Sequence, residues 1–143
     1  MFENINYLLV FIVSIVQFIV GAIWYMPIFG NLWGKIHGFE QLNPEVQSEM
    51  QKSMLPYLFT QFVMTFITNL VLIILIRALK ESPLSIIMIC FLVWIGFVAT
   101  TQVVGVIFGG DKKEWMLTKI GIMVSHEFVN FMIAGAIFQY FLK

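Results

Sequence analysis

Long apolar stretches separated by short polar segments run along the whole chain. Residues 4–34, 53–76 and 82–110 contain no charged residue, and residues 120–142 contain only Glu127. A helix needs roughly 20 apolar residues to cross the hydrocarbon core of a bilayer, and lipid offers backbone groups no other hydrogen-bond partner. The pattern therefore predicts four transmembrane helices, over residues 5–25, 55–76, 84–108 and 116–141.

The connection between the first two predicted helices, residues 27–52, is the one sizeable connection. Within it, Asn43-Pro44 is typical of a helix start, and the residues that follow predict a short amphipathic helix lying flat at the headgroup level. We expect Pro56 to bend or break the path into the second long helix. The expected fold is all-α: one transmembrane domain, residues 1–143, built as a four-helix bundle with a short interfacial helix between helices 1 and 2.

Composition narrows the class of protein further. The chain is 60% hydrophobic and 11% charged, whereas soluble domains are about 45–50% apolar and about 25% charged. Eight basic and eight acidic residues cancel, so no net field attracts nucleic acid. The single cysteine, Cys90, excludes an internal disulfide and a multi-cysteine metal site. We expect a membrane protein with membrane lipid as a partner, no nucleic acid and no cofactor.

The first apolar stretch does not resemble a cleaved signal peptide, because no basic residue precedes it and no small-x-small cleavage site follows. We therefore expect an integral protein of the bacterial inner membrane. Four crossings place both termini on the same side. Basic residues favour the cytoplasmic side, and the two sides carry Lys35, Lys52, Lys112, Lys113 and Lys119 against Arg77, Lys80 and Lys143. The difference favours external termini and leaves the orientation open.

Aromatic and small residues gather where the first predicted helix ends: Gly21, Trp24, Tyr25, Pro27, Phe29, Gly30 and Trp33. This cluster, followed by Trp94–Ala99 and by Ile107-Phe108-Gly109, resembles the signature of an uncharacterised bacterial membrane family, a domain of unknown function. The resemblance covers most of the chain. It implies four membrane helices and no particular activity.

The residues of this cluster allow two interpretations. Tryptophan and tyrosine prefer the headgroup boundary, and Pro27 disfavours further helix, so the cluster could anchor and end the helix. It could instead form the aromatic-lined mouth of a pocket. Small residues let membrane helices approach closely, and we expect four of them at close helix contacts: Gly21, Gly96, Gly121 and Ser125.

Polar side chains inside the predicted helices carry the candidate chemistry. Glu127 lies within roughly 3 Å of the centre of the fourth helix, where a charge costs at least about 2.5–3.5 kcal/mol and marks a candidate functional site. We expect the candidates for binding or proton relay to face inward: Glu127, His126, Asn130, Gln17, Gln61, Asn69 and Gln102. The alternative is a protonated, structural Glu127 whose carboxyl is bonded to one of the amides of Gln17, Gln61, Asn69 or Gln102.

Several function classes stay open. His126-Glu127-x-x-Asn130 lacks the second histidine of a zinc-protease helix, so we expect no metal and assign no catalytic residue. An oligomeric, proton-linked transporter or channel for an unidentified small solute or ion is one possibility. A non-catalytic structural, regulatory or lipid-binding protein is another, and a lipid-modifying enzyme with Glu127 as general base is a third. Because one bundle can hardly bury every polar and small-residue face, we expect a homo-oligomer.

Overall fold

The computed structural model describes residues 5–142, and every element in that part of the chain is a helix. This confirms the all-α prediction. Four helices are long and apolar enough to cross a membrane: Tyr7–Ile28, Pro44–Ala78, Ile86–Phe108 and Lys113–Phe141. Residues 1–4 and 143 of the predicted single domain lie outside the described residues.

Two of these four helices contain a π-helical segment. The first consists of α1 (Tyr7–Ile23) and the π-helix η1 (Trp24–Ile28), and the third of α5 (Ile86–Val93), the π-helix η3 (Trp94–Ala99) and α6 (Thr100–Phe108). The remaining elements are α2 (Gly30–Ile36), the 3-10 helix η2 (Phe39–Gln41), α3 (Pro44–Ser53), α4 (Leu55–Ala78) and α7 (Lys113–Phe141).

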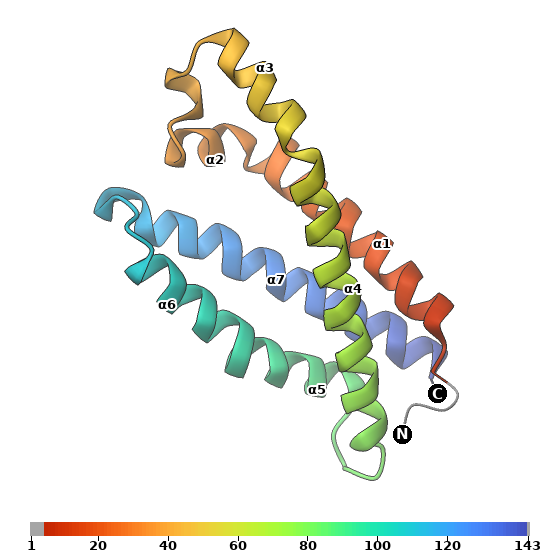
Figure 1. The fold of residues 1–143 in the computed structure, drawn as a ribbon. Helices are drawn as coiled ribbons and strands as arrows, with labels where there is room; N and C mark the ends of the chain where they lie inside the picture. Colours follow the sequence, from red (N-terminus) through yellow and green to blue (C-terminus); the bar gives the residue numbers. More distant parts are fainter. Residues whose placement is uncertain (1–4, 143) are drawn as a thin grey trace.

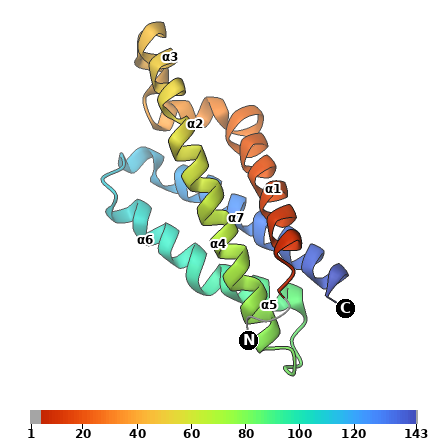
Figure 2. The same cartoon turned by 45° about the vertical axis from the view of Figure 1, so that its right-hand side comes forward.

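The predicted short helix between helices 1 and 2 is not clearly shown as a separate interfacial element. The segment Pro44–Ser53 is helical, but α3 runs on through Met54 into α4 in nearly the same direction (Figures 1 and 2). The expected interruption at Pro56 takes the form of a helix boundary without a large bend: α3 ends at Ser53, and α4 begins at Leu55 with Pro56 in its first turn. A missing N–H removes no helical hydrogen bond there.

Helix α7 is central to the arrangement of the bundle. Helix α1 packs against it, α5 and α6 pack along another side, and α4 packs mainly against α1 (Figure 1). Successive long helices run in opposite directions, so the first turn of α1 and the last turn of α7 lie at the same end of the bundle (Figures 1 and 2).

The tightest packing lies in the half of the bundle near that end. Its buried apolar side chains come from α1, α4, α5 and α7 and include Val10, Ile73 and Phe138. Gly135 makes the close approach of α7 to α5, since a Cβ there would lie 3.2 Å from the Cys90 sulfur. The other half of the bundle is packed less completely, and the polar residues gather at the boundary between the two halves.

Two of the glycines expected at close helix contacts are not at such contacts. A Cβ at Gly96 or Gly121 would meet no atom within 4 Å, so those predictions are wrong for contacts within the chain. Gly21 fits the expectation, because a Cβ there would lie 3.2 Å from His126 Nε2. The Ser125 hydroxyl donates to the Gly121 carbonyl of its own helix. The small-residue pattern marked candidate faces, but helix rotation determines which of them meets a neighbour.

Candidate functional site

Two tryptophans attach the π-helices to the middle of α7. Each begins a π-helix and donates its indole N–H to an α7 backbone carbonyl: Trp24 Nε1 to Ile122 O at 3.1 Å, and Trp94 Nε1 to Val124 O at 3.2 Å. In η1 the wide turn accommodates Pro27, which has no N–H to donate. Such π-helical turns occur frequently at functional sites. Both attachments lie within one turn of His126.

The aromatic cluster encloses His126. The rings of Trp24 and Tyr25 lie 6.1 and 5.0 Å from the imidazole, centroid to centroid, and Gly21 leaves room for its Nε2. Tyr25 is backed in turn by Trp33, 4.8 Å away. The cluster therefore forms a wall around a buried histidine of α7. The π-helical turn at Pro27 leads through Phe29 directly into α2 at Gly30.

His126 connects Glu127 to Asn130. Its Nδ1 lies 3.1 Å from Glu127 Oε1, and its Nε2 lies 3.2 Å from the Asn130 amide nitrogen. With Asn130 Nδ2 as the donor, Nε2 accepts and the ring proton lies on Nδ1, facing the Glu127 carboxyl group.

A hydrogen-bonded network joins the same part of α7 to α1 and α4. Gln17 Nε2 donates to the backbone carbonyl of Asn130 at 2.8 Å, while Gln17 Oε1 accepts from Asn69 Nδ2 at 2.7 Å. Asn69 Nδ2 also donates to Ser14 Oγ at 3.0 Å. All four side chains are buried, so the three helices are held by polar contacts at the level of Glu127.

Glu127 lies at the side of a hollow of about 210 Å³ enclosed by α1, α4, η3 and α7. Its lining residues are Gln17, Gln61, Met64, Thr65, Thr68, Val98, Glu127, Asn130 and Phe131. They lie near the middle of the four membrane-length helices, and Glu127 is the central residue of α7. Gln17 and Asn130 are buried, whereas Gln61 and Thr68 are exposed. The hollow therefore opens sideways, at mid-membrane depth.

The structure brings most of the predicted site residues to this hollow. Glu127, Asn130, Gln17 and Gln61 line it, and His126 and Asn69 contact lining residues directly. The contact recorded for the Glu127 carboxylate among the described residues is with His126, in place of the expected amide from another helix.

Gln102 and two threonines differ from the expectation. Gln102 is absent from the lining, and its Oε1 is buried without a hydrogen-bond partner among the described residues. Thr65 and Thr68 line the hollow but are not among the predicted site residues. Their spacing of four and seven residues after Gln61 puts all three on one helix face, which was the available signal.

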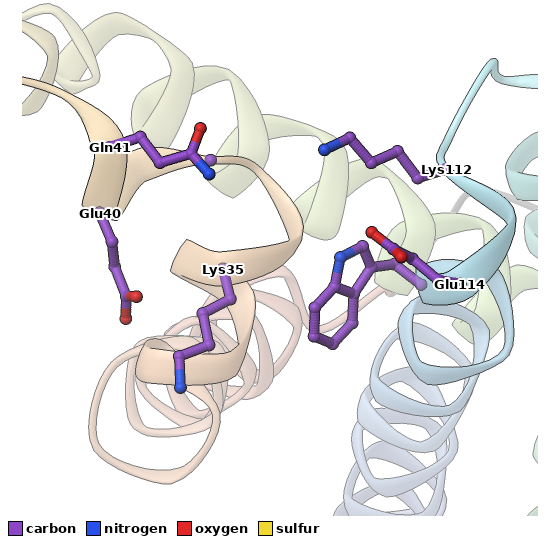
Figure 3. Close-up of a pocket in the computed structure, with 7 residues that line it drawn as sticks. Lys35, Glu40, Gln41, Lys112 and Glu114 are labelled. Atoms are coloured by element: carbon purple, nitrogen blue, oxygen red, sulfur yellow. The ribbon is translucent and has the colours of Figure 1, made fainter.

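A second hollow, of about 270 Å³, lies at the end of the bundle where α7 begins (Figure 3). Side chains of both charges surround it, contributed by α2, by the segment that follows α2 through η2, and by the start of α7: Lys35, Glu40, Gln41, Lys112 and Glu114, with Gly38 and Trp115. Beside it, the Lys119 ammonium lies 2.7 Å from Asp111 Oδ1 and 5.9 Å from the centre of the Trp33 ring. Charged groups and aromatic rings thus occur together at this end of the bundle.

Comparison with known proteins identifies one family. A family model described as "Protein of unknown function (DUF1761)" matches residues 8–139, which include both hollows and both π-helices. A search of the curated proteins and of the solved structures found no match.

Proposed function

The chain belongs to this family of unknown function, and from that premise we propose that it is an oligomeric, proton-linked transporter or channel for a small solute or ion. The observation that carries the proposal is the carboxylate of Glu127 at the side of a polar hollow in the middle of four membrane-length helices. An acidic group at this depth is expensive to maintain and typically marks an ion or proton pathway.

The contact between Glu127 and His126 supports the link to protons. Their facing atoms are 3.1 Å apart, within hydrogen-bond distance. Imidazole and carboxyl groups are the usual members of intramembrane proton relays. The buried imidazole packs against Trp24 and Tyr25 and is absent from the lining of the hollow, so Glu127 is the member of the pair that a solute in the hollow would contact.

The sideways opening supports a homo-oligomer. Gln61 and Thr68 are exposed at mid-membrane depth, where contact with acyl chains leaves polar atoms without partners. A second copy packed over this opening would cover them and would complete the path between subunits. Gly96 and Gly121, whose surroundings are open within the chain, provide further surfaces for close approach.

The proposed location is the bacterial inner membrane, with both termini on the same side. The chain ends described by the structure lie at one end of the bundle (Figure 1), as this topology requires. The excess of lysines at the opposite end favours a cytoplasmic position for the first and third connections.

A proteoliposome assay tests the transport proposal. Liposomes that contain the purified protein and a pH-sensitive dye should show proton flux above that of empty liposomes, and Glu127→Gln should abolish it because an amide preserves shape but does not titrate. Glu114→Gln is the matched control, since this exposed carboxylate lies on the same helix outside the mid-membrane hollow. Equal flux in wild type and Glu127→Gln would contradict the role of this carboxylate.

The hollow of Figure 3 favours a second candidate, a non-catalytic lipid-binding protein. Its lysines and glutamates match the phosphate and ammonium groups of a zwitterionic headgroup. Native mass spectrometry from nanodiscs should then show retained phosphatidylethanolamine that is lost in a Lys35→Gln/Lys112→Gln double variant and kept in Lys52→Gln, a lysine of α3 outside this hollow. Retention of the lipid by the double variant would contradict this candidate.

A further inference from the structure

The hydroxyl groups of Thr65 and Thr68, which line the mid-membrane hollow, donate their protons to carbonyls of their own helix. Thr65 Oγ1 donates to the Gln61 carbonyl at 2.9 Å, and Thr68 Oγ1 donates to the Met64 carbonyl at 3.0 Å. A hydroxyl group has one proton and two lone pairs. Both oxygens can therefore offer a ligand only acceptor lone pairs.

The side-chain amides of Gln17 and Asn130 likewise have their nitrogen atoms in hydrogen-bond contacts. The Asn130 side-chain nitrogen lies 3.2 Å from His126 Nε2, and Gln17 Nε2 donates to the backbone carbonyl of Asn130 at 2.8 Å. Asn130 Oδ1 is buried and has no hydrogen-bond partner among the described residues, although the side chain lines the hollow and the residue is only 6% exposed. An unsatisfied buried acceptor costs about 1–3 kcal/mol, which a bound donor or cation would recover.

Glu127 adds the only formal charge among the lining residues. One carboxylate oxygen contacts the imidazole of His126, and the side chain is 22% exposed, so acceptor positions on the carboxylate remain for a ligand. Neither lysine nor arginine occurs in the lining. The hollow thus combines one negative charge with an excess of oxygen acceptors.

We propose that this hollow binds a single monovalent cation, with Na⁺ as the representative, through oxygen atoms of Glu127, Asn130, Thr65 and Thr68; the proposal rests on the proposed transport function and names its substrate class. One carboxylate neutralises one positive charge. A divalent ion would leave an uncompensated charge in a medium of low dielectric constant.

The chemistry of the donors also argues against a transition metal. Oxygen ligands suit hard cations, whereas imidazole and thiolate suit the softer metals. Among the described residues, no group of three or more His, Cys, Asp and Glu side chains could hold a metal ion. The imidazole of His126 faces the carboxylate through Nδ1 and leaves the oxygens for the cation.

Equilibrium binding of radioactive Na⁺ to purified protein in nanodiscs tests the proposal, with choline replacing Na⁺ at constant ionic strength. Wild type should bind Na⁺ saturably, and Glu127→Gln should weaken binding by about ten-fold or more. Thr65→Val and Thr68→Val should each weaken it by about three-fold, the effect of one lost oxygen contact. Thr60→Val is the matched control, because its hydroxyl donates to Pro56 O of the same helix outside the hollow, and it should bind like wild type.

The competitors and the flux assay separate the outcomes. Displacement by K⁺ or ammonium supports a monovalent site, whereas stronger displacement by Mg²⁺ or Ca²⁺ overturns it. Wild-type binding by Glu127→Gln, or no saturable binding at all, also overturns it. If Glu127→Gln fails to fold, as judged by size-exclusion chromatography, the two threonine variants decide. Proton flux without Na⁺ binding would support the transport proposal and refute the cation site. Na⁺ binding without any flux would support the cation site and refute the transport proposal.

Discussion

Gly21 and Gly121 have opposite surroundings although both lie in membrane-length helices. A Cβ at Gly21 would lie 3.2 Å from His126 Nε2, closer than ordinary van der Waals contact, whereas a Cβ at Gly121 would meet no atom within 4 Å. The imidazole cannot move away freely, because Tyr25 packs against it and Glu127 and Asn130 hold its two nitrogens. Gly21 is therefore the residue that makes space for His126.

A leucine at Gly21 should destabilise the protein, since overpacking typically costs about 1–3 kcal/mol. Gly121→Leu should leave the stability of the monomer nearly unchanged. Thermal unfolding in detergent, monitored by circular dichroism, compares the two variants. Equal melting temperatures for wild type and Gly21→Leu would show that the ring has more freedom than these contacts allow.

Helices α1 and α4 are joined at mid-membrane depth by Asn69, which donates to Gln17 and to Ser14. Apolar residues alone provide little driving force between helices in lipid, where the surroundings are equally apolar. Interhelical hydrogen bonds of this kind contribute about 0.6 kcal/mol on average in membrane proteins and about 1.7 kcal/mol at most. This polar contact therefore supports the arrangement of the two helices that enclose the hollow.

A double-mutant cycle with Asn69→Leu and Gln17→Leu should measure a coupling energy of about 0.6–1.7 kcal/mol. Each single variant removes the bond between the two side chains. Unfolding in mixed micelles supplies the four stabilities. Thr60→Val paired with Gln17→Leu is the control cycle and should show additivity, because Thr60 bonds within its own helix. Additivity in the Asn69 cycle would mean that the contact contributes nothing.

The molecule as a whole is packed unevenly. Its buried apolar cluster occupies the half of the bundle near the start of α1 and the end of α7, and the hollow opens sideways beside α4, where Gln61 and Thr68 are exposed. A monomer in lipid would expose Gln61 at this opening. Covering the opening with a second copy removes polar atoms from acyl chains, which is the physical basis for expecting an oligomer.

Cysteine cross-linking locates the interface. In a Cys90→Ala background, Gln61→Cys should form disulfide-linked dimers in native membranes, because this position should lie near a neighbouring copy. Ile12→Cys, on the exposed face of α1, should remain monomeric at the same protein density. Dimers of Ile12→Cys together with monomeric Gln61→Cys would place the interface on another face, and monomers of both would contradict an oligomer covering the opening.

Helix number and type follow from local pattern, because the length of a charge-free apolar stretch alone determines whether a helix can cross a membrane. The central position of Glu127 followed from the same count. The nearly common direction of α3 and α4 did not follow, because proline in a first helical turn and proline in a helix interior look alike until the helix start is known. Nor did the π-helices, whose first residues, Trp24 and Trp94, donate to backbone carbonyls of α7.

Periodicity therefore sufficed for the four helices and for the polar face of each, because both depend on residues close together in the chain. The pairing of those faces required the folded chain. His126 faces Gly21, and Gln17 faces Asn69 and Asn130, across separations that no local pattern encodes. A helix rotated by one residue turns its side chains by about 100°, so the same stripes could have met other partners. Packing selected which amides and hydroxyls surround Glu127, and left Gln102 outside the hollow.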